Sequence, residues 1–249
     1  MKKTITKTKG VILAGGLGTR LHPLTSVISK HLLPIYNKPM IFYPLSVLID
    51  AGIKDIMIIT TKENEDNFKK LLGTGRDFNV NLTYKVQDKP EGIAQALILS
   101  EKWLDNSQVL LILGDNLFFG PNLNGIIKDA LVKNRGATIF CIESKNPERF
   151  GVIEFKNQSE VVKIEEKPSQ PKTNWVVTGL YIYNNKASEH AKLLKKSKRG
   201  EYEITDLNNH YLKGNELSVK KLDNNFSWLD TGTFDSLLEA SNYVKKIES

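Results

Sequence analysis

The stretch VILAGGLGTRLHP, residues 11–23, joins a short apolar run to a turn with three glycines in four positions. The run 11–15 has the composition of a buried strand. Because glycine has no Cβ, backbone N–H groups in such a turn can approach phosphate oxygens closely. Arg20 follows and offers a permanently charged, forked donor. The stretch favours a phosphate-binding turn, although a tight turn with a solvated arginine remains the simpler interpretation of this segment alone.

The turn departs from two familiar phosphate-binding patterns. Gly16 and Gly18 fit the first part of a dinucleotide fingerprint, but Leu21 stands where the third glycine belongs. No Gly-Lys-Ser/Thr closes the turn, as the other common phosphate loop requires. We expect a helix to begin after the glycines and to add the partial positive charge of its N-terminus.

Apolar runs alternate with segments of helical periodicity from residue 10 to about residue 140. Strand-like runs lie at 11–15, 53–60, 82–87, 109–115 and 137–143, and helical segments lie at 39–52, 64–73, 92–104 and 123–136. Continuous apolar strands that alternate with amphipathic helices are typical of a largely parallel sheet covered on both faces. The predicted fold is α/β, a Rossmann-like three-layer sandwich with a largely parallel mixed sheet.

The pattern becomes richer in strands after residue 145. Two strands around an Asn-Gln-Ser turn, two later strands and a final helix are expected at 150–168, 176–183, 217–222 and 234–247. No Gly/Ser-rich or Pro-rich linker divides the chain. We therefore expect a basic tail over 1–9 and a single domain over 10–249, in which about 10–140 and about 141–249 form a larger and a smaller, β-rich part.

Composition limits the class of protein. The 249 residues are 40% hydrophobic and 25% charged, as in ordinary soluble globular proteins. No apolar run approaches the roughly 18 residues of a membrane span, and the basic start lacks the apolar core of a secretory signal, so we expect a cytoplasmic protein without a membrane partner. The net charge of +7 allows an anionic partner. Much of it lies in the first residues and in 192–200, where a solvated helix face explains it better than nucleic-acid binding.

Two further charged residues are expected near the glycine turn. Ligands of open α/β sheets bind at the carboxyl ends of the strands, so the turn 15–18 and Asp115, which follows the run 109–114, would face one crevice if their strands are neighbours. Asp115 suits a magnesium ion that bridges phosphates, or it is a helix N-cap. Lys30, in a polar loop, suits a second phosphate contact or simply faces solvent.

The smaller part of the chain adds three candidates. Strand alternation in EVVKIEEKP puts Val162, Ile164 and Glu166 on one face, where an inward Glu166 needs sugar hydroxyls or a cation as a partner, with Lys167 beside it. Both charged residues can equally end a surface strand. Asp230 precedes the last helix, which Thr231 or Thr233 can cap, so Asp230 is available as a second metal carboxylate.

Several other chemistries find no support. His22, His31, His190 and His210 lack zinc-site spacing, and there is no nucleophile elbow or recognisable Ser/His/Asp grouping. Cys141, the single cysteine, lies within a strand-like run and is expected to be a core residue.

Nine segments, in order along nearly the whole chain, carry a specific resemblance. They are ILAGGLGTRL, SKHLLPIYNKPMIFYPLSVLIDAGI, QDKPEGIAQAL, LGDNLFFG, NPERFGV, EEKP, VVTGLYIY, RGEYEITD and SWLDTGTFDSLLEAS. Together they closely resemble the glucose-1-phosphate thymidylyltransferases, a family of sugar-phosphate nucleotidyltransferases. The resemblance implies that the larger part binds a nucleoside triphosphate, that the smaller part binds a sugar-1-phosphate, that Mg²⁺ is the cofactor, and that the protein is a homo-oligomer.

The resemblance also implies roles for individual residues. The nucleotide side would comprise Leu13, Gly15, Gly16, Gly18, Thr19, Arg20, Lys30 and His31 around the triphosphate, with Gln87 and Gly92 at the base. Asp115 and Asp230 would hold magnesium. The sugar-phosphate pocket would comprise Gly151, Glu166, Lys167, Val177 and Gly179, with Arg199 beside it.

This sequence departs from the family pattern at three places. His31 stands where these enzymes usually carry Gln, and Phe150 replaces the usual Tyr. The chain also ends with LLEASNYVKKIES, without the C-terminal extension that contributes to a regulatory nucleotide site in longer members. The sequence gives no basis for expecting feedback inhibition through that extension.

The implied reaction is magnesium-dependent nucleotidyl transfer from dTTP to glucose-1-phosphate, giving dTDP-glucose and pyrophosphate. The second pKa of a phosphate is near 6, so the attacking oxygen needs no general base, and Arg20, Lys30, Lys167 and the two aspartates would align and neutralise the reacting groups. One alternative keeps this chemistry with UTP, CTP or another sugar-1-phosphate. Another is a non-catalytic nucleotide-sugar sensor.

Overall fold

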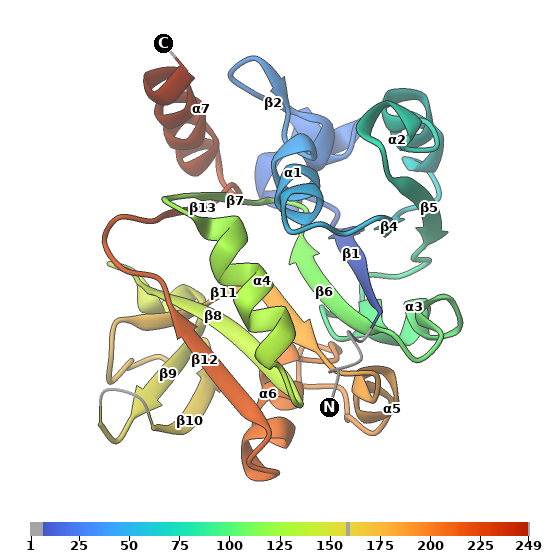
Figure 1. The fold of residues 1–249 in the computed structure, drawn as a ribbon. Helices are drawn as coiled ribbons and strands as arrows, with labels where there is room; N and C mark the ends of the chain where they lie inside the picture. Colours follow the sequence, from blue (N-terminus) through green and yellow to red (C-terminus); the bar gives the residue numbers. More distant parts are fainter. Residues whose placement is uncertain (1–6, 158–159, 249) are drawn as a thin grey trace.

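The computed structural model describes residues 7–157 and 160–248. The nine strands of its main sheet are β1 (Thr8–Ala14), β4 (Asp55–Thr60), β5 (Asn81–Val86), β6 (Gln108–Leu113), β8 (Ala137–Glu143), β9 (Gly151–Phe155), β10 (Val161–Glu166), β11 (Trp175–Tyr183) and β12 (Leu217–Lys221). Their order is β10-β9-β11-β6-β1-β4-β5, with β8 paired to both β11 and β12 (Figure 1).

Parallel pairing dominates the half of the sheet that contains β1. This strand pairs in parallel with β4 on one side and β6 on the other, and β4 pairs in parallel with β5. Strand β11 pairs antiparallel with β6, β8 and β9, while β9 and β10 form an antiparallel hairpin. The sheet is therefore mixed and largely parallel, as the sequence predicts.

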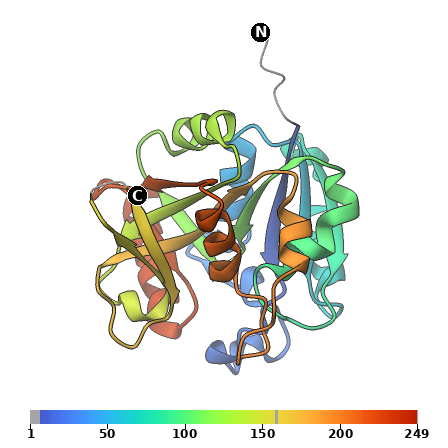
Figure 2. The same ribbon diagram turned by 90° about the horizontal axis from the view of Figure 1, so that it is seen from below.

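Helices cover both faces of the sheet. On one face lie α1 (Phe42–Asp50), α2 (Glu65–Leu72) and α4 (Leu123–Lys133), and on the other lie α3 (Gln95–Leu104), α5 (Ala187–Lys192) and α6 (Ile204–Lys213) (Figure 2). The alternation of side chains along β1 explains the two cores, because Val11 belongs to the cluster under α3 whereas Ile12 belongs to the cluster under α1. The predicted three-layer sandwich is confirmed.

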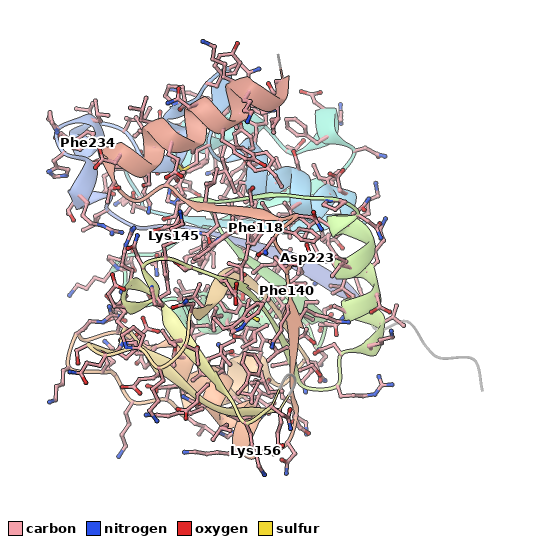
Figure 3. All side chains as sticks on the ribbon, turned by 90° about the vertical axis from the view of Figure 1, so that its left-hand side faces the viewer. Phe118, Phe140, Lys145, Lys156, Asp223 and Phe234 are labelled. Carbon is pink, nitrogen blue, oxygen red and sulfur yellow. The ribbon has the colours of Figure 1, made fainter. Side chains whose placement is uncertain are left out.

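A third apolar cluster lies beside the sheet, under helix α7 (Phe234–Glu248). It joins α7 to the short hairpin β2–β3 (Pro34–Ile35, Lys38–Pro39) and to the two-stranded antiparallel sheet of β7 (Asn116–Phe119) and β13 (Ser227–Asp230). The buried side chains that make this contact are Ile35, Met40, Tyr43, Leu117, Ala240 and Val244. Figure 3 shows Phe234 at the start of α7 and Lys156, at the tip of the β9–β10 hairpin, at opposite ends of the molecule. The pairing of β13 with β7 brings the last third of the chain to the end of β6.

Short 3₁₀ helices occupy the loops. They are η1 (Thr19–Leu21), η2 (Leu24–Ser26), η3 (Lys30–Leu32), η4 (Arg76–Phe78) and η5 (Pro147–Arg149). The helix expected after the glycine turn is only the three-residue η1, so the prediction of an α-helix N-terminus there is wrong. A single 3₁₀ turn has few aligned peptide dipoles and adds little positive charge.

Other expectations in the chain need correction as well. Val162 is 54% exposed whereas Ile164 is buried, because the β9–β10 register shifts between Val161 and Lys163 and turns Val162 outward. Helix α5 ends at Lys192, so the basic segment 193–200 is a loop and not a helix face. Strand β1 begins at Thr8, two residues before the expected start of the domain. The rest of the expected tail, 1–6, and most of the Asn-Gln-Ser turn lie outside the described residues.

Two smaller expectations concern the core and the membrane. Cys141 is fully buried in β8, and burial raises the pKa of its thiol to about 12, which agrees with its prediction as a core residue. In the part of the chain that the structure describes, every helix is too short or too polar to cross a lipid bilayer.

Candidate active site

A crevice opens at the carboxyl ends of β1 and β6. These strands are parallel neighbours with Leu13 opposite Leu113, so the glycine turn and Asp115 leave the sheet at the same edge, as predicted. A cavity of about 580 Å³ lies there. Among its lining residues are twelve of the predicted site residues, namely Leu13, Gly16, Arg20, Lys30, His31, Asp115, Gly151, Glu166, Lys167, Val177, Gly179 and Asp230. The two parts of the chain therefore share one cavity.

The remaining predicted residues lie around this cavity and not in its lining. They are Gly15, Gly18, Thr19, Gln87, Gly92 and Arg199. Gly18 has a φ of +63°, which favours glycine, and a Cβ at Gly15 would lie 2.0 Å from Oε1 of Gln87. The glycine turn thus needs glycine for its backbone and for close packing against Gln87.

Lys30 and Asp115 form a buried ion pair at the centre of the site. The Lys30 ammonium contacts Oδ2 of Asp115, and Asn116 donates from Nδ2 to Asp115 Oδ1 at 2.9 Å. Burial alone would raise the pKa of Asp115, but the Lys30 charge and these hydrogen bonds hold it well below its usual value. Asp115 precedes β7, so its interpretation as a helix cap is wrong.

His31 lies beside this pair as a neutral ring. Burial and the adjacent Lys30 charge lower the pKa of its imidazole to about 3. Its Nδ1 is 2.9 Å from the Ser29 hydroxyl, and its Cδ2 would lie 2.7 Å from a Cβ at Gly114. The ring is therefore fixed on the side of the glycine turn 15–18, at the position where the family pattern has an amide.

Strand pairing brings Asp230 to Asp115. In the antiparallel pair β7–β13, Asp230 lies opposite Asn116, the neighbour of Asp115. Burial, and then the charge of Asp115, raise the pKa of Asp230. Helix α7 is capped by Thr233, whose Oγ1 accepts from Ser236 N at 3.3 Å, whereas Thr231 donates to the Asp115 carbonyl at 2.8 Å. Asp230 is not needed as a cap, and its carboxylate faces the cavity.

The side of the cavity that is predicted to bind the sugar phosphate, called the sugar side below, is built on β9, β10 and α6. Thr205 donates to Glu166 Oε2 at 2.5 Å, and a Cβ at Gly151 would lie 3.1 Å from the Thr205 hydroxyl. Lys167 Nζ lies 3.9 Å from Glu166 Oε1, and the Lys167 backbone has a φ of +45°, an uncommon conformation for a residue with a side chain. Glu166 therefore faces inward with a partner, and its interpretation as a surface residue is wrong. The Lys167 side chain lines the same cavity but is 47% exposed, so Lys167 is also a surface residue at the end of the strand.

Two residues that sequence reasoning did not assign to the site line the same cavity. Asn116, only 2% exposed, accepts from Gly179 N at 3.0 Å and from Trp228 Nε1 at 2.6 Å while it donates to Asp115. Arg149 donates to Asp230 Oδ2 at 3.2 Å. The signal for Asn116 is a polar residue at the start of the apolar strand NLFF, but two of its three partners, Gly179 and Trp228, lie over 60 residues away in the chain.

The segment that carries Arg199 and the loop between Gln87 and α3 meet outside the cavity. Arg199 donates to both carboxylate oxygens of Glu203, at 3.1 and 2.8 Å, and lies 3.7 Å from Glu166. Tyr202 N donates to the Glu91 carbonyl at 2.7 Å, and Ala94 N donates to the Tyr202 carbonyl at 3.2 Å. A backbone bridge therefore joins the segment that carries Arg199 to the loop between Gln87 and α3.

Glycine is required within this bridge. Gly92 has a φ of +98°, and a Cβ there would lie 2.5 Å from the Tyr202 carbonyl oxygen. Gln87 is buried and donates to Gln95 Oε1 at 2.5 Å, and Gln95 in turn donates to Glu91. Gln87 and Gly92 thus belong to one packed loop at the edge of the cavity.

The three-layer fold and its cavity, in which two carboxylates and several basic side chains converge at the ends of parallel strands, define an α/β protein that handles phosphorylated ligands. The family model described as nucleotidyl transferase matches residues 9–247. A glucose-1-phosphate thymidylyltransferase from Neisseria meningitidis is 54% identical over 97% of this chain and 84% of its own length. The enzyme of that name from Mycolicibacterium smegmatis is 51% identical over 96% of this chain and 83% of its own.

Solved structures agree with these relatives. A Bacillus anthracis protein in complex with sucrose, described as a candidate glucose-1-phosphate thymidylyltransferase, has a TM-score of 0.89 and 43% identity, covering 96% of this chain and 95% of that one. A UDP-glucose pyrophosphorylase complexed with UDP-glucose has a TM-score of 0.83 and 25% identity, covering 96% and 99%. The chain belongs to the nucleotidyl transferase family and, within it, to the glucose-1-phosphate thymidylyltransferases.

The cavity suits a divalent metal, which nucleotidyltransferases generally use. Asp115 and Asp230 are two largely buried carboxylates. Burial, and then the charge of Asp115, raise the pKa of Asp230, so a cation held by both would relieve their repulsion. Among the described residues there is no group of three or more His, Cys, Asp or Glu side chains that could hold a metal. Any ion here would complete its coordination with water and substrate phosphates, which is how Mg²⁺ is usually held.

Proposed function

We propose that this protein transfers the thymidylyl group of dTTP to glucose-1-phosphate and releases dTDP-glucose and pyrophosphate. The observation that carries the proposal is the single cavity, which combines the glycine turn, two neighbouring carboxylates and Lys167 in a chain 54% identical to a named glucose-1-phosphate thymidylyltransferase. Both anionic substrates need a basic partner in such a cavity. Arg20 and Lys30 supply it for the nucleoside triphosphate, and Lys167 supplies it for the sugar phosphate.

The chemistry we propose is an in-line displacement. An oxygen of the sugar phosphate attacks the α-phosphorus of dTTP, the new P–O bond forms, and the bond to pyrophosphate breaks. The second pKa of a phosphate is near 6, so the attacking oxygen is already ionised at neutral pH and no side chain has to remove a proton. Alignment of two anions and neutralisation of their charge account for the catalysis.

Each side chain has a proposed part in this alignment. The turn 15–18 with Thr19 and Arg20 holds the triphosphate, and Lys30 approaches the reacting phosphates. Lys167 holds the sugar phosphate, and Glu166, oriented by Thr205, accepts sugar hydroxyls together with the backbone around Gly151, Val177 and Gly179. Arg199 would have to leave Glu203 to reach a phosphate.

Mg²⁺ is the proposed metal, held by Asp115 and Asp230. When bound, it supplies positive charge to the phosphates of the nucleotide and to the departing pyrophosphate. Lys30 remains close to Asp115 and keeps that carboxylate ionised.

For the base, we propose recognition by Gln87 and Gly92, with His31 beside the triphosphate. An amide can pair with a pyrimidine edge, and glycine leaves room for the ring. UTP is the second candidate nucleotide, because the fold also matches a UDP-glucose complex over 99% of that chain and because His31 departs from the family pattern.

A nucleotide panel tests the proposal. Purified protein is given glucose-1-phosphate with dTTP, UTP or CTP and Mg²⁺, and pyrophosphate release is measured. The highest kcat/KM is expected with dTTP, and Asp115→Asn should remove turnover whereas the exposed control Asp77→Asn should not. Binding of dTDP-glucose without turnover by the wild type would instead identify a sensor, and preference for UTP would change the substrate but not the chemistry.

We also propose that the protein is a homo-oligomer. Helix α7 exposes Leu238 and Ile247, of which 62% and 51% is accessible, and such apolar side chains favour self-association. Sedimentation velocity over a range of concentrations tests this, and a monomer at every concentration would contradict it.

A further inference from the structure

The two carboxylates of the site each hold a basic side chain. Asp115 contacts Lys30, and Asp230 accepts from Arg149 at 3.2 Å. The two pairs differ in exposure, since the Lys30 and Asp115 side chains are 11% and 14% exposed, whereas those of Arg149 and Asp230 are 37% and 17% exposed. An arginine that is partly solvated can leave its partner at lower cost than a buried lysine. Arg149 should therefore leave Asp230 more easily than Lys30 leaves Asp115 when another cation competes for the carboxylate.

Arg149 reaches Asp230 from the sugar side of the cavity. It is the last residue of η5, two positions before Gly151, and its guanidinium carbon lies 5.4 Å from the centre of the Phe150 ring. Lys167 N donates to the Phe150 carbonyl at 3.0 Å, so the segment that carries Arg149 is bonded to the residue proposed to hold the sugar phosphate. Arg149 thus spans the distance between the metal carboxylate and the sugar-phosphate pocket.

The contacts of Phe150 fix the backbone of Arg149 and leave its side chain to move. The Phe150 ring packs edge-on against Trp228 with ring centres 4.8 Å apart, and Trp228 donates to Asn116. Among the described residues, the polar contact of the guanidinium is the 3.2 Å bond to Asp230, made by one of its two terminal nitrogens. A guanidinium offers five donors and binds phosphate through two parallel bonds, so a phosphate is a stronger partner for it than this single contact.

We propose that Arg149 is an exchangeable counter-ion: it neutralises Asp230 in the empty site, and when a divalent metal takes that carboxylate, Arg149 turns to the phosphate of the sugar-1-phosphate. The inference rests on the proposed function, in which the metal and the sugar phosphate occupy this cavity together. It assigns to Arg149 two opposite effects. Arg149 weakens metal binding to the empty protein, and it strengthens binding of the sugar phosphate.

The first effect is measured without any substrate. Mn²⁺ is titrated into wild type, Arg149→Gln and Arg149→Lys without nucleotide, and bound metal is followed by water proton relaxation up to millimolar concentrations. A partly exposed ion pair is worth at most about a fivefold change in an equilibrium constant. Arg149→Gln should therefore bind Mn²⁺ up to about fivefold more tightly, while Arg149→Lys, which keeps the charge, stays close to wild type. Arg76→Gln, an exposed arginine on η4, is the matched control.

The second effect is measured in steady-state turnover. Arg149→Gln should raise the KM for glucose-1-phosphate by about tenfold, the size expected for a lost charge-assisted hydrogen bond, with little change in the KM for dTTP. Arg149→Lys should recover part of this loss. A residue that only supports the fold would weaken metal binding and affect both KM values.

Three results separate the possible failures. Mn²⁺ binding to Arg149→Gln that is unchanged or weaker, with wild-type thermal stability, overturns the exchange. An unchanged KM for glucose-1-phosphate overturns the transfer of Arg149 to the sugar phosphate. If wild type binds no metal even with dTTP and forms no pyrophosphate, the proposed function itself fails, and the inference fails with it.

Discussion

Asn116 offers a sharp test of how the site is assembled, because a single amide joins its two sides. Its Nδ2 donates to Asp115, and its Oδ1 accepts from Gly179 N and from Trp228 Nε1. Asn116→Leu keeps a similar volume and removes all three bonds. Two buried donors then lack a partner, and the Asp115 carboxylate loses a donor.

The expected loss of stability follows from these three bonds. At about 1 kcal/mol for each neutral bond and about 2 kcal/mol for the bond to the carboxylate, the free energy of unfolding should fall by about 4 kcal/mol. Urea denaturation followed by tryptophan fluorescence measures it, and Asn185→Ala, at an exposed position, serves as the control. In variant protein that is still folded, kcat/KM should fall because neither Asp115 nor Gly179 is held in place.

A clear outcome would refute this reasoning. If Asn116→Leu loses less than about 1 kcal/mol with an unchanged dependence on urea, the amide contributes no more than an ordinary surface contact. Normal stability with normal turnover would mean that Asp115 and Gly179 are oriented independently of each other. Asn116→Asp is a second variant of the same shape, which restores the acceptor but not the donor to Asp115.

Three further predictions use other parts of the molecule. Lys167→Ala should raise the KM for glucose-1-phosphate at least tenfold without unfolding the protein, as circular dichroism and pyrophosphate release will show; the exposed Lys102→Ala should change neither. Gly92→Ala should lower the free energy of unfolding by about 2 kcal/mol, because its φ of +98° and the Tyr202 carbonyl both exclude a Cβ; a variant as stable as wild type in urea would contradict this. Cys141, whose thiol has a pKa raised to about 12 by burial, should not react with a thiol reagent at pH 8 until urea unfolds the chain, so rapid labelling of folded protein would be incompatible with its burial.

Local pattern was sufficient for the centre of this fold. Strands such as 109–113 are buried on both faces of the sheet, so they are continuous apolar runs that the sequence predicts as strands. The glycine turn and Asp115 lie at the same edge because β1 and β6 pair in parallel. Contacts between segments that are far apart in the sequence are harder to predict. The antiparallel pairing of β7 with β13, which brings Asp230 to Asp115, joins segments over 100 residues apart, and no local periodicity in the sequence predicts it.

The errors also have physical causes. The register shift between Val161 and Lys163 adds a residue to one strand, so simple alternation assigned Val162 to the wrong face. Arg149 belongs to a segment that was recognised, NPERFGV, but its role depends on a partner 81 residues later. The sequence around Arg149 does not reveal this role, because the carboxylate that it contacts lies in a distant part of the chain.

The backbone bridge between Tyr202 and the loop Glu91–Ala94 bears on how substrate preference can change. Two main-chain hydrogen bonds tie the loop proposed to meet the base to the segment that leads to Thr205 and the sugar pocket. A substitution that shifts one segment must shift the other, since main-chain bonds transmit displacement regardless of side-chain identity. In directed evolution toward a new nucleotide-sugar, positions on the two segments should be randomised as one library and screened against pairs of substrates.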